Sequence, residues 1–504
     1  MNCEIFCMFL LIPATSFLIV LFLIKHRQTR LLPPGPKKLP LIGNLHQLDG
    51  SCLPHLSLER LSNQYDPIMF LQLGSIPTLV ISSADVARDI FKSHDVVFSG
   101  RPDLFAANKF SYGCKNISFA PYGDYWREVR KIAILELLSS KRVQTFHAVR
   151  SEEVDSMLQF IVQSSGPINL SRLTLLLANN IVCRATFGKK FDDGGDSGAS
   201  KLESLMRETQ ALLGTSSVAD FFPWMEWINK FNGRKTSLEK YFTELDKLLD
   251  EQVQEHHDPK IPRPEHEDLV DVLLRVQKDS SQVITLTNDH IKAVLNNNSQ
   301  DIFLAGTDTS SATLTWAMTE LLKNSSAMER AQNEVRGVVK GKDKVEEDDL
   351  PKLMYLKLVL KEALRLHPPA PLLVPRETTQ DCTVGGYTIP SKTRVIINAK
   401  AIATDLKHWE NPYEFRPERF LNSSIDFKGQ HFELIPFGVG RRGCPGMNFA
   451  IPLVELALAN LLYRFDWKLP PEILRSEDLD MEEAFGITMH KKTHLCLVAS
   501  PASL

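Results

Sequence analysis

The chain has 504 residues, of which 43% are hydrophobic and 24% charged, and its formal net charge is −3. This composition predicts a packed globular body rather than a disordered chain. The near-neutral charge, with no basic stripe interleaved with aromatic residues, gives no reason to expect nucleic acid as a partner. The eight cysteines form no CxxC pair, which argues against a disulfide framework or a zinc finger.

The N-terminal segment predicts a membrane anchor. Residues Ile5–Ile24 are almost wholly apolar and have about the length of a membrane-spanning helix, ~20 residues. Basic residues gather directly after it, in Lys25–Arg30, whereas only Glu4 precedes it. The positive-inside rule therefore places the body of the chain in the cytosol. A cleaved secretory signal is the weaker alternative, because no basic region precedes the apolar run. We expect an anchor at 1–24, a basic and proline-rich linker at 25–40 and one large domain at 41–504.

The body of the chain predicts mainly helices with a small β region. Two β-rich apolar runs within Ile68–Ser82 are split by Gly74 and Pro77, which indicates a hairpin. Apolar residues then recur at intervals of three and four, so most of Ala84–Leu366 is expected to be helical. Strand character returns in Thr383–Asn398.

Several shorter segments complete this prediction. Leu453–Leu462 is expected to be helical, and short strands are expected to finish the chain. Pro452 should kink the helix that contains it. By composition, Asp192–Ser200 and His256–Glu267 are expected to be loops.

The most specific motif is the decapeptide Phe437–Gly446, FGVGRRGCPG. A thiolate that holds iron needs a cysteine, here Cys444, on a loop whose glycines let the backbone bend close to the sulfur and to a flat cofactor. A helix that begins just after Pro445 would lower the thiol pKa through its dipole. Arg442 can form a charge-assisted bond with a cofactor carboxylate. A glycine-rich turn around an ordinary buried cysteine is the alternative, which the spacing F-x-x-G-x-R-x-C-x-G disfavours.

This decapeptide resembles the cysteine-ligand loop of the cytochrome P450 superfamily, in which a cysteine thiolate holds haem iron. The resemblance runs from the anchor to Met489. It implies the cytochrome P450 fold, haem b with its iron axially ligated by Cys444, and Phe437 beside that haem. It also implies a monooxygenase reaction in which NADPH–cytochrome P450 reductase delivers the electrons. Residues 41–504 would then be the haem-thiolate monooxygenase domain.

A second motif, Ala305–Ser310 (AGTDTS), resembles the centre of the family's long oxygen-side helix. A glycine inside a helix weakens one turn and leaves room for dioxygen. The Thr309 hydroxyl can bond back to the Ala305 carbonyl or release it to hold a water molecule. Asp308 can pass protons in from solvent. We therefore expect Thr309 and Asp308 to be catalytic, although the motif alone would equally suit a break in a core helix.

Further positions are implied by the resemblance alone. Trp126 and Arg130 lie on one helix face, four residues apart, where the family contacts a haem propionate. Arg101 and Arg376 fall where further propionate contacts are implied, although either could be an ordinary exposed arginine. Lys131 and Arg441 are cations that could meet an acidic reductase.

The resemblance also implies a buried structural network of Glu362, Arg365 and Arg419. Three positions depart from the family pattern. Asn296–Gln300 is a longer polar stretch than usual, Lys400 replaces an aromatic residue, and Thr404 replaces an arginine.

The PPGP hinge, AGTDTS and the cysteine loop together are similar to the A-type group of plant microsomal enzymes. That similarity implies an endoplasmic-reticulum anchor and a small lipophilic substrate of terpenoid, alkaloid or phenolic type. Apolar segments expected to line its pocket are Pro102–Phe119, Leu212–Trp227, Ile302–Thr309, Ala370–Val374 and Ala484–Thr488. Two alternatives stay open: a haem-thiolate isomerase or dehydratase that rearranges peroxides, and a non-enzymatic haem-binding sensor.

Overall fold

The computed structural model describes residues 31–502 except 49, 51, 191–195, 262–266, 280–285, 299–304, 472, 474 and 485. The predicted anchor at 1–24 lies outside these residues, as does the part of the linker before residue 31. Within the described ranges, no helix has both the length and the apolar character that a membrane crossing requires.

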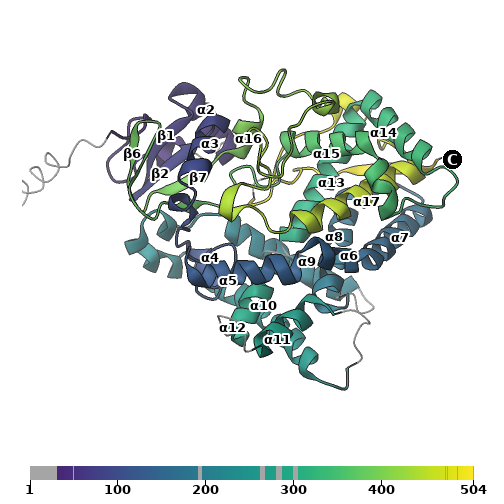
Figure 1. Ribbon diagram of the computed structural model, residues 1–504, viewed down its shortest axis with the longest axis horizontal. Helices are drawn as coiled ribbons and strands as arrows, with labels where there is room; N and C mark the ends of the chain where they lie inside the picture. The colour runs from purple at the N-terminus through teal and green to yellow at the C-terminus, as the bar shows by residue number, and fades with distance from the viewer. Residues whose placement is uncertain are drawn as a thin grey trace, which may run out of the picture.

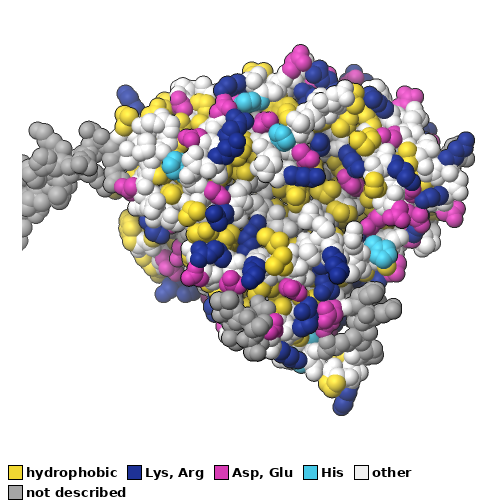
Figure 2. Space-filling view, viewed as in Figure 1, with side chains coloured by type: hydrophobic (Ala, Val, Ile, Leu, Met, Phe, Trp, Pro, Cys, Tyr) yellow, Lys and Arg dark blue, Asp and Glu magenta, His cyan; other side chains and the backbone are white. Residues whose placement is uncertain are grey.

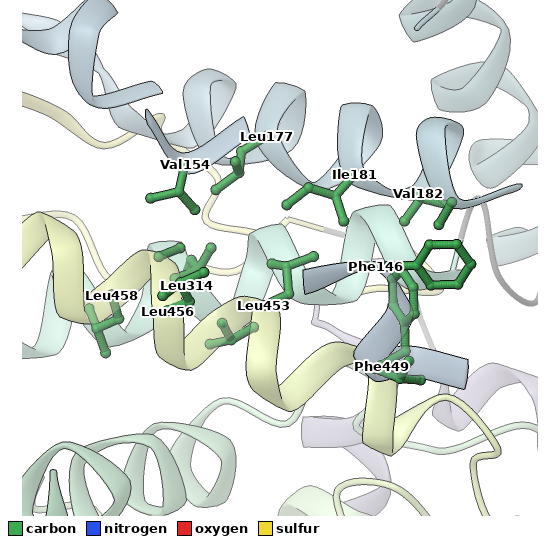
Figure 3. Packing of buried hydrophobic residues seen from close by; sticks show 14 of the residues in the cluster. Phe146, Val154, Leu177, Ile181, Val182, Leu314, Phe449, Leu453, Leu456 and Leu458 are labelled. Carbon is green, nitrogen blue, oxygen red and sulfur yellow. The ribbon is translucent and has the colours of Figure 1, made fainter. Parts of the chain in front are cut away.

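The helical body is built around α13 (Ala305–Lys323), which packs against α8 (Leu170–Phe187), α15 (Met354–Leu366) and α17 (Met447–Arg464). Nearly all of α13 is buried, and many of its side chains are small, so neighbouring helices can approach it closely. Figure 3 shows apolar side chains of α8, α13 and α17 pointing into the space between these helices.

Buried hydroxyl groups on α13 find partners across the helix interface. Thr174 of α8 lies 3.0 Å from Ser311 and 3.2 Å from Thr315 between their side-chain oxygens. These hydrogen bonds offset the cost of burying polar groups in a helix core. They also fix how α13 is rotated about its axis relative to α8.

A small mixed sheet lies beside the helical body, toward the N-terminal side (Figure 1). Its strand order is β1-β2-β7-β4. β1 (Ile68–Leu73) and β2 (Ile76–Ile81) form the predicted antiparallel hairpin, and β7 (Arg394–Ile397) pairs in parallel with β2. The expected strand segment after residue 382 is also confirmed, with its turn at Gly385 and Gly386, both at positive φ.

The remaining elements are mostly helices. The other helices of five or more residues are α2 (Pro54–Gln64), α3 (Ala84–Ser93), α4 (Phe105–Phe110), α5 (Asp124–Ile132), the π-helix η3 (Ala133–Leu137), α6 (Ser140–Thr145), α7 (His147–Gln163), α9 (Asp196–Gly214), the 3₁₀ helix η5 (Pro223–Lys230), α10 (Arg234–His257), α11 (Leu269–Lys278), α12 (Asn288–Asn298), α14 (Ser325–Val338), the 3₁₀ helix η7 (Glu347–Lys352) and α16 (Ala399–Ala403). The other strands are β3 (Ile168–Asn169), β4 (Arg376–Glu377), β5 (Cys382–Val384), β6 (Tyr387–Ile389), β8 (Phe465–Lys468) and β9 (Cys496–Pro501).

Two loop predictions were wrong at their ends. Residues 196–200 belong to α9, although DSGAS reads as a loop by composition, and His256 and His257 still belong to α10. In both cases the neighbouring helix extends into a stretch of weak helix formers, because propensity is only a weak prior beside tertiary packing. Asn296–Asn298 close α12, whereas the rest of that polar stretch lies outside the described residues.

Charged side chains of both signs are interspersed over the face drawn in Figure 2, with hydrophobic side chains between them. This face therefore carries mixed charge rather than a broad patch of one sign. That distribution agrees with the near-neutral net charge of the sequence.

Candidate active site

The loop 437–446 is tightly folded by its glycines. Gly438 and Gly440 have φ values of 68° and 70°, in the left-handed region that side chains rarely adopt. The Cys444 N–H donates to the Phe437 carbonyl at 2.8 Å, which closes the loop. α17 begins at Met447, directly after the loop, so its N-terminus lies beside the cysteine as predicted.

Cys444 is exposed and opens onto a pocket of about 440 Å³. The lining of this pocket includes Phe437, Arg130 and the backbone of Gly438 and Gly443. Cys183, by contrast, is buried, and burial raises the pKa of its thiol. The structure thus places one cysteine of a rigid loop at the edge of a cavity, next to an aromatic side chain and a cation.

Arginines gather around this loop. Arg442 is buried and donates to the carbonyls of Ser99, Ile117 and Ala120. Its guanidinium lies 4.2 Å from the ring centroid of Trp126. The planar fork of an arginine suits such a set of acceptors, because all its N–H groups point outward in one plane.

Trp126 and Arg130 extend this cluster from α5. The Trp126 indole N–H donates to the Ile117 carbonyl at 2.8 Å, and Arg130 donates to the Gly443 carbonyl. The Arg130 guanidinium lies 5.5 Å from the Trp126 ring centroid. The structure therefore brings Trp126, Arg130 and Arg442 together against the cysteine loop, as the predicted spacing on one helix face required.

Arg376 and Arg101 approach from the sheet side. Arg376 is buried, donates to the Val439 carbonyl at 2.6 Å and lies 3.7 Å from a carboxylate oxygen of Asp95. Arg101 donates to the carbonyls of Ser118, Val374 and Pro375. Neither is an ordinary exposed arginine.

The positive charge of this region fits the carboxylates of haem b. Burial lowers the pKa of Arg376 to about 10; Asp95 acts to raise it, and the charge of Arg130 lowers it further. Cations held this close to one another favour an anionic group between them. Cysteine sulfur at a cavity, an adjacent phenyl ring and several guanidinium groups are the donor set that haem iron, the porphyrin face and two propionates need.

On α13, the first turns carry the second predicted motif. The Thr309 hydroxyl donates to the Ala305 carbonyl, as the sequence predicted. A Cβ on Gly306 would lie 3.4 Å from a methyl group of Val182, so α8 approaches this turn closely. Asp308 is buried, and one of its carboxylate oxygens lies 2.7 Å from Nε2 of His490.

The predicted network of Glu362, Arg365 and Arg419 is confirmed. Glu362 and Arg365 are fully buried, and both oxygens of the carboxylate accept from Arg365 at 2.8 Å. Arg419 also donates to Glu362 at 2.8 Å, and Arg365 reaches the carbonyls of Ala403 and Pro412. The network joins α15 to the segment that leads into the cysteine loop.

Sequence reasoning missed two side chains at this site. Asp95 accepts from the Arg441 N–H at 2.9 Å and lies against Gly440, so it supports the cysteine loop from α3's C-terminal side. His490, which pairs with Asp308, was not singled out either. Both contacts join residues far apart in the chain, and only the HKK run at 490–492 offered a local signal of charge.

Of the predicted substrate-lining segments, several meet in space. The Phe105 N–H donates to Asp220 at 2.8 Å, which joins the first segment to the second. A Cβ on Gly214 would lie 2.7 Å from the Ile487 nitrogen, which joins the second to the last. Residues 302–304 lie outside the described part of the chain.

Comparison with known proteins agrees with this geometry. The family model "Cytochrome P450" matches residues 33–498. Cytochrome P450 71A9 of Glycine max is 63% identical over 475 residues, which cover 94% of this chain and 93% of that protein. Strychnine-11-hydroxylase of Strychnos nux-vomica is 56% identical over 98% of this chain and 97% of its own length.

A solved structure of a zebra fish cytochrome P450 with progesterone superposes with a TM-score of 0.75 at 27% identity, and the match covers 90% of this chain and 100% of that one. The family uses haem b with cysteine-ligated iron, and its plant members related to this chain are monooxygenases. The chain therefore belongs to the cytochrome P450 family.

Proposed function

We propose that this chain is an NADPH- and O₂-dependent monooxygenase of the endoplasmic-reticulum membrane that oxidises a small lipophilic specialised metabolite of terpenoid, alkaloid or phenolic type. The anchor is residues 1–24, and the catalytic domain faces the cytosol. The observation that carries the proposal is the convergence of Cys444, Trp126, Arg130 and Arg442 at the loop 437–446.

Each residue has a role in this proposal. Cys444 would ligate the haem iron, and Phe437 would contact the porphyrin. The residues that would hold the propionates are Arg101, Trp126, Arg130, Arg376 and Arg442. When bound, haem b supplies the electron transfer and the oxygen chemistry, which a thiolate ligand promotes. A guanidinium group that turned from a backbone carbonyl to a propionate would exchange a neutral acceptor for a charged one. The hydrogen bond to the charged acceptor is the stronger of the two.

The α13 side handles protons. The Thr309 hydroxyl can exchange its bond to the Ala305 carbonyl for one to a water molecule or to dioxygen. Asp308 holds a proton next to it and delivers it to that hydroxyl. The apolar segments orient the substrate and exclude water from the reaction.

Relatives support the substrate class without choosing a member of it. Strychnine-11-hydroxylase, desmethyl-deoxy-podophyllotoxin synthase and costunolide synthase are 56%, 46% and 44% identical to this chain, and their names specify three different compounds. We therefore propose the class alone. NADPH–cytochrome P450 reductase is the proposed electron donor, docking where Lys131 and Arg441 expose their charges.

The proposal is tested in microsomes that contain the full chain and a reductase. We expect the reduced, carbon-monoxide-treated protein to show the red-shifted Soret band of a thiolate-ligated haem, and NADPH-dependent product from at least one terpenoid, alkaloid or phenolic. Cys444→Ser should lose both, whereas Cys382→Ser should keep both, because burial raises the pKa of the Cys382 thiol to about 11. Consumption of a peroxide without NADPH would instead favour an isomerase, and haem binding without turnover of any compound would favour a sensor.

A further inference from the structure

The contact between His490 and Asp308 joins the C-terminal segment to the first turn of α13. His490 Nε2 and Asp308 Oδ1 are 2.7 Å apart. The Asp308 side chain is 9% exposed and the His490 side chain 36%. The histidine thus lies between solvent and a buried carboxylate.

The backbone around His490 is fixed by hydrogen bonds on both sides. The Met489 N–H donates to the Pro369 carbonyl at 2.9 Å, and the Trp316 indole donates to the Met489 carbonyl at 3.0 Å. The His490 carbonyl accepts from the Ala484 N–H at 2.8 Å. Because Trp316 belongs to α13 itself, the imidazole is held in register with the helix that carries Asp308.

The second carboxylate oxygen of Asp308 has a different environment. Among the described residues, Asp308 Oδ2 is buried and makes no hydrogen bond. The hydroxyl oxygens of Thr307 and Ser310 on the same helix are also buried and make no hydrogen bond within the described chain. A buried polar atom without a protein partner costs about 1–3 kcal/mol, and such atoms call for an explanation in a native structure. Oδ1 is therefore tied to His490, while Oδ2 keeps the capacity to donate a proton inward once protonated.

Electrostatics ties the two groups together. Burial lowers the pKa of His490, but the charge and hydrogen bond of Asp308 raise it by more, so the net shift is upward. Within the described chain, Asp308 is the charged group that acts on this histidine. Lys491 donates to the backbone carbonyl of Asp480 and Lys492 to the Glu482 carboxylate, whereas Glu320, further along α13, pairs with His367.

We propose that His490 is a positioning residue that holds Asp308 and resupplies its proton from solvent. The imidazolium gives its Nε2 proton to Oδ1 of Asp308, and a half-turn of the carboxyl group about its Cβ–Cγ bond then carries that protonated oxygen to the inward side. The neutral imidazole takes a new proton from hydronium in the solvent. The net change is one proton moved from solvent to the carboxyl group, with no other bond made or broken. This inference deepens the proposed function, on which it rests, by naming the entry point of the protons.

The pairing is tested first without any substrate, on the full-length, haem-loaded protein. Diethyl pyrocarbonate modifies neutral imidazole, and mass spectrometry of peptides locates the modified residue. We expect the pH midpoint of His490 modification to lie above that of an ordinary histidine. In Asp308→Asn it should fall, because the charge and hydrogen bond of the Asp308 carboxylate raise the pKa of His490. An unchanged midpoint in Asp308→Asn would overturn the proposal.

The proton supply is tested by the share of NADPH electrons that appear as hydrogen peroxide, measured across pH in reductase-containing microsomes without added substrate. In the wild type this share should rise as the pH climbs through the His490 titration, because the imidazolium is lost. His490→Gln keeps an N–H donor but cannot titrate. Its peroxide share should be severalfold higher at neutral pH and nearly independent of pH.

His494→Gln is the matched control, since His494 lies in the same segment, is exposed and contacts Asn169 rather than α13. It should behave like the wild type in both experiments. A wild-type pH profile in His490→Gln, at normal haem content, would exclude the proton-supplying role. If NADPH is consumed neither in this assay nor with any of the added compounds, the proposed function fails, while the modification profile still decides whether His490 and Asp308 are paired.

Discussion

The two sides of the proposed haem site are built on opposite principles. On the side of the ligand loop (residues 437–446), the buried arginine and carboxylate groups are densely bonded: Arg442 reaches three carbonyls and the Glu362 carboxylate accepts from two arginines. One oxygen of Asp95 makes no hydrogen bond within the described part of the chain, but it lies 3.7 Å from the Arg376 guanidinium. On the α13 side, Thr307, Ser310 and one oxygen of Asp308 are buried without a hydrogen bond. The ligand side is therefore held in one geometry, whereas the α13 side has polar atoms that can still form hydrogen bonds.

This difference matches what each side has to do in the proposed reaction. A thiolate ligand needs a loop that keeps one geometry, and a fully bonded polar network gives that rigidity. A proton path needs groups whose hydrogen bonds can be exchanged, and buried hydroxyls with spare capacity provide them. Substitutions on the ligand side should therefore cost folding and haem binding, whereas substitutions on the α13 side should change the fate of protons and electrons.

The largest effect is expected from Glu362→Ala. The change leaves Arg365, which is fully buried, and Arg419 without their carboxylate, at a cost of about 3–5 kcal/mol of folding free energy. We expect little or no haem-loaded protein, measured as the red-shifted carbon monoxide band per milligram of chain. The control is Glu410→Ala, which breaks an exposed pair with Arg416 and should cost ~1 kcal/mol or less. Normal haem content in Glu362→Ala would contradict the inference that haem binding depends on the hydrogen-bonded network of Glu362.

A smaller effect on the same side is expected from Gly440→Ala. Its φ of 70° disfavours a side chain, and a Cβ would lie 2.5 Å from Oδ1 of Asp95, whose other carboxylate oxygen accepts from the Arg441 N–H. The left-handed conformation alone costs about 1–3 kcal/mol. We expect a lower unfolding temperature and faster haem loss.

Gly341→Ala separates the two causes. Its φ is 86°, but a Cβ would meet no described atom within 4 Å, and the residue does not line the Cys444 pocket. The variant should therefore show only the conformational destabilisation and keep its haem. Equal haem loss in both variants would show that the Asp95 contact is unimportant for the ligand loop.

Much of the ligand side could be predicted from sequence because its signals are local. The glycine spacing of residues 437–446 fixes the turn, and Trp126 and Arg130 share a helix face by their spacing of four. The β1–β2 hairpin followed likewise from two β-rich apolar runs split by Gly74 and Pro77. The roles of these residues in haem binding remain predictions, because the geometry gives their positions and not their contacts with the cofactor.

The remaining features depend on long-range contacts that no local pattern contains. β7 joins β2 although more than 300 residues separate them, and Asp95 meets the ligand loop from a distant helix end. His490 reaches Asp308 across 182 positions in sequence. Likewise, α9 extends into a stretch that composition assigned to a loop, because packing outweighs weak local preference.

Substitutions on the α13 side are expected to have the smallest effect on stability and the clearest effect on the reaction. Thr309→Ala tests this expectation. The variant loses a hydroxyl that donates to the Ala305 carbonyl, a bond that a helix does not need for its own integrity. We expect normal haem content but a roughly tenfold lower ratio of product to peroxide per NADPH, equivalent to about 1.4 kcal/mol. Thr313→Ala is the matched control, because its hydroxyl makes the same backward bond, to the Thr309 carbonyl at 2.8 Å, one turn further from the site. If both variants divert electrons to peroxide equally, the effect comes from a less stable α13 rather than from the proton-handling hydroxyl. In that case the α13 side would not be specialised for proton exchange, and the contrast with the ligand side would be wrong.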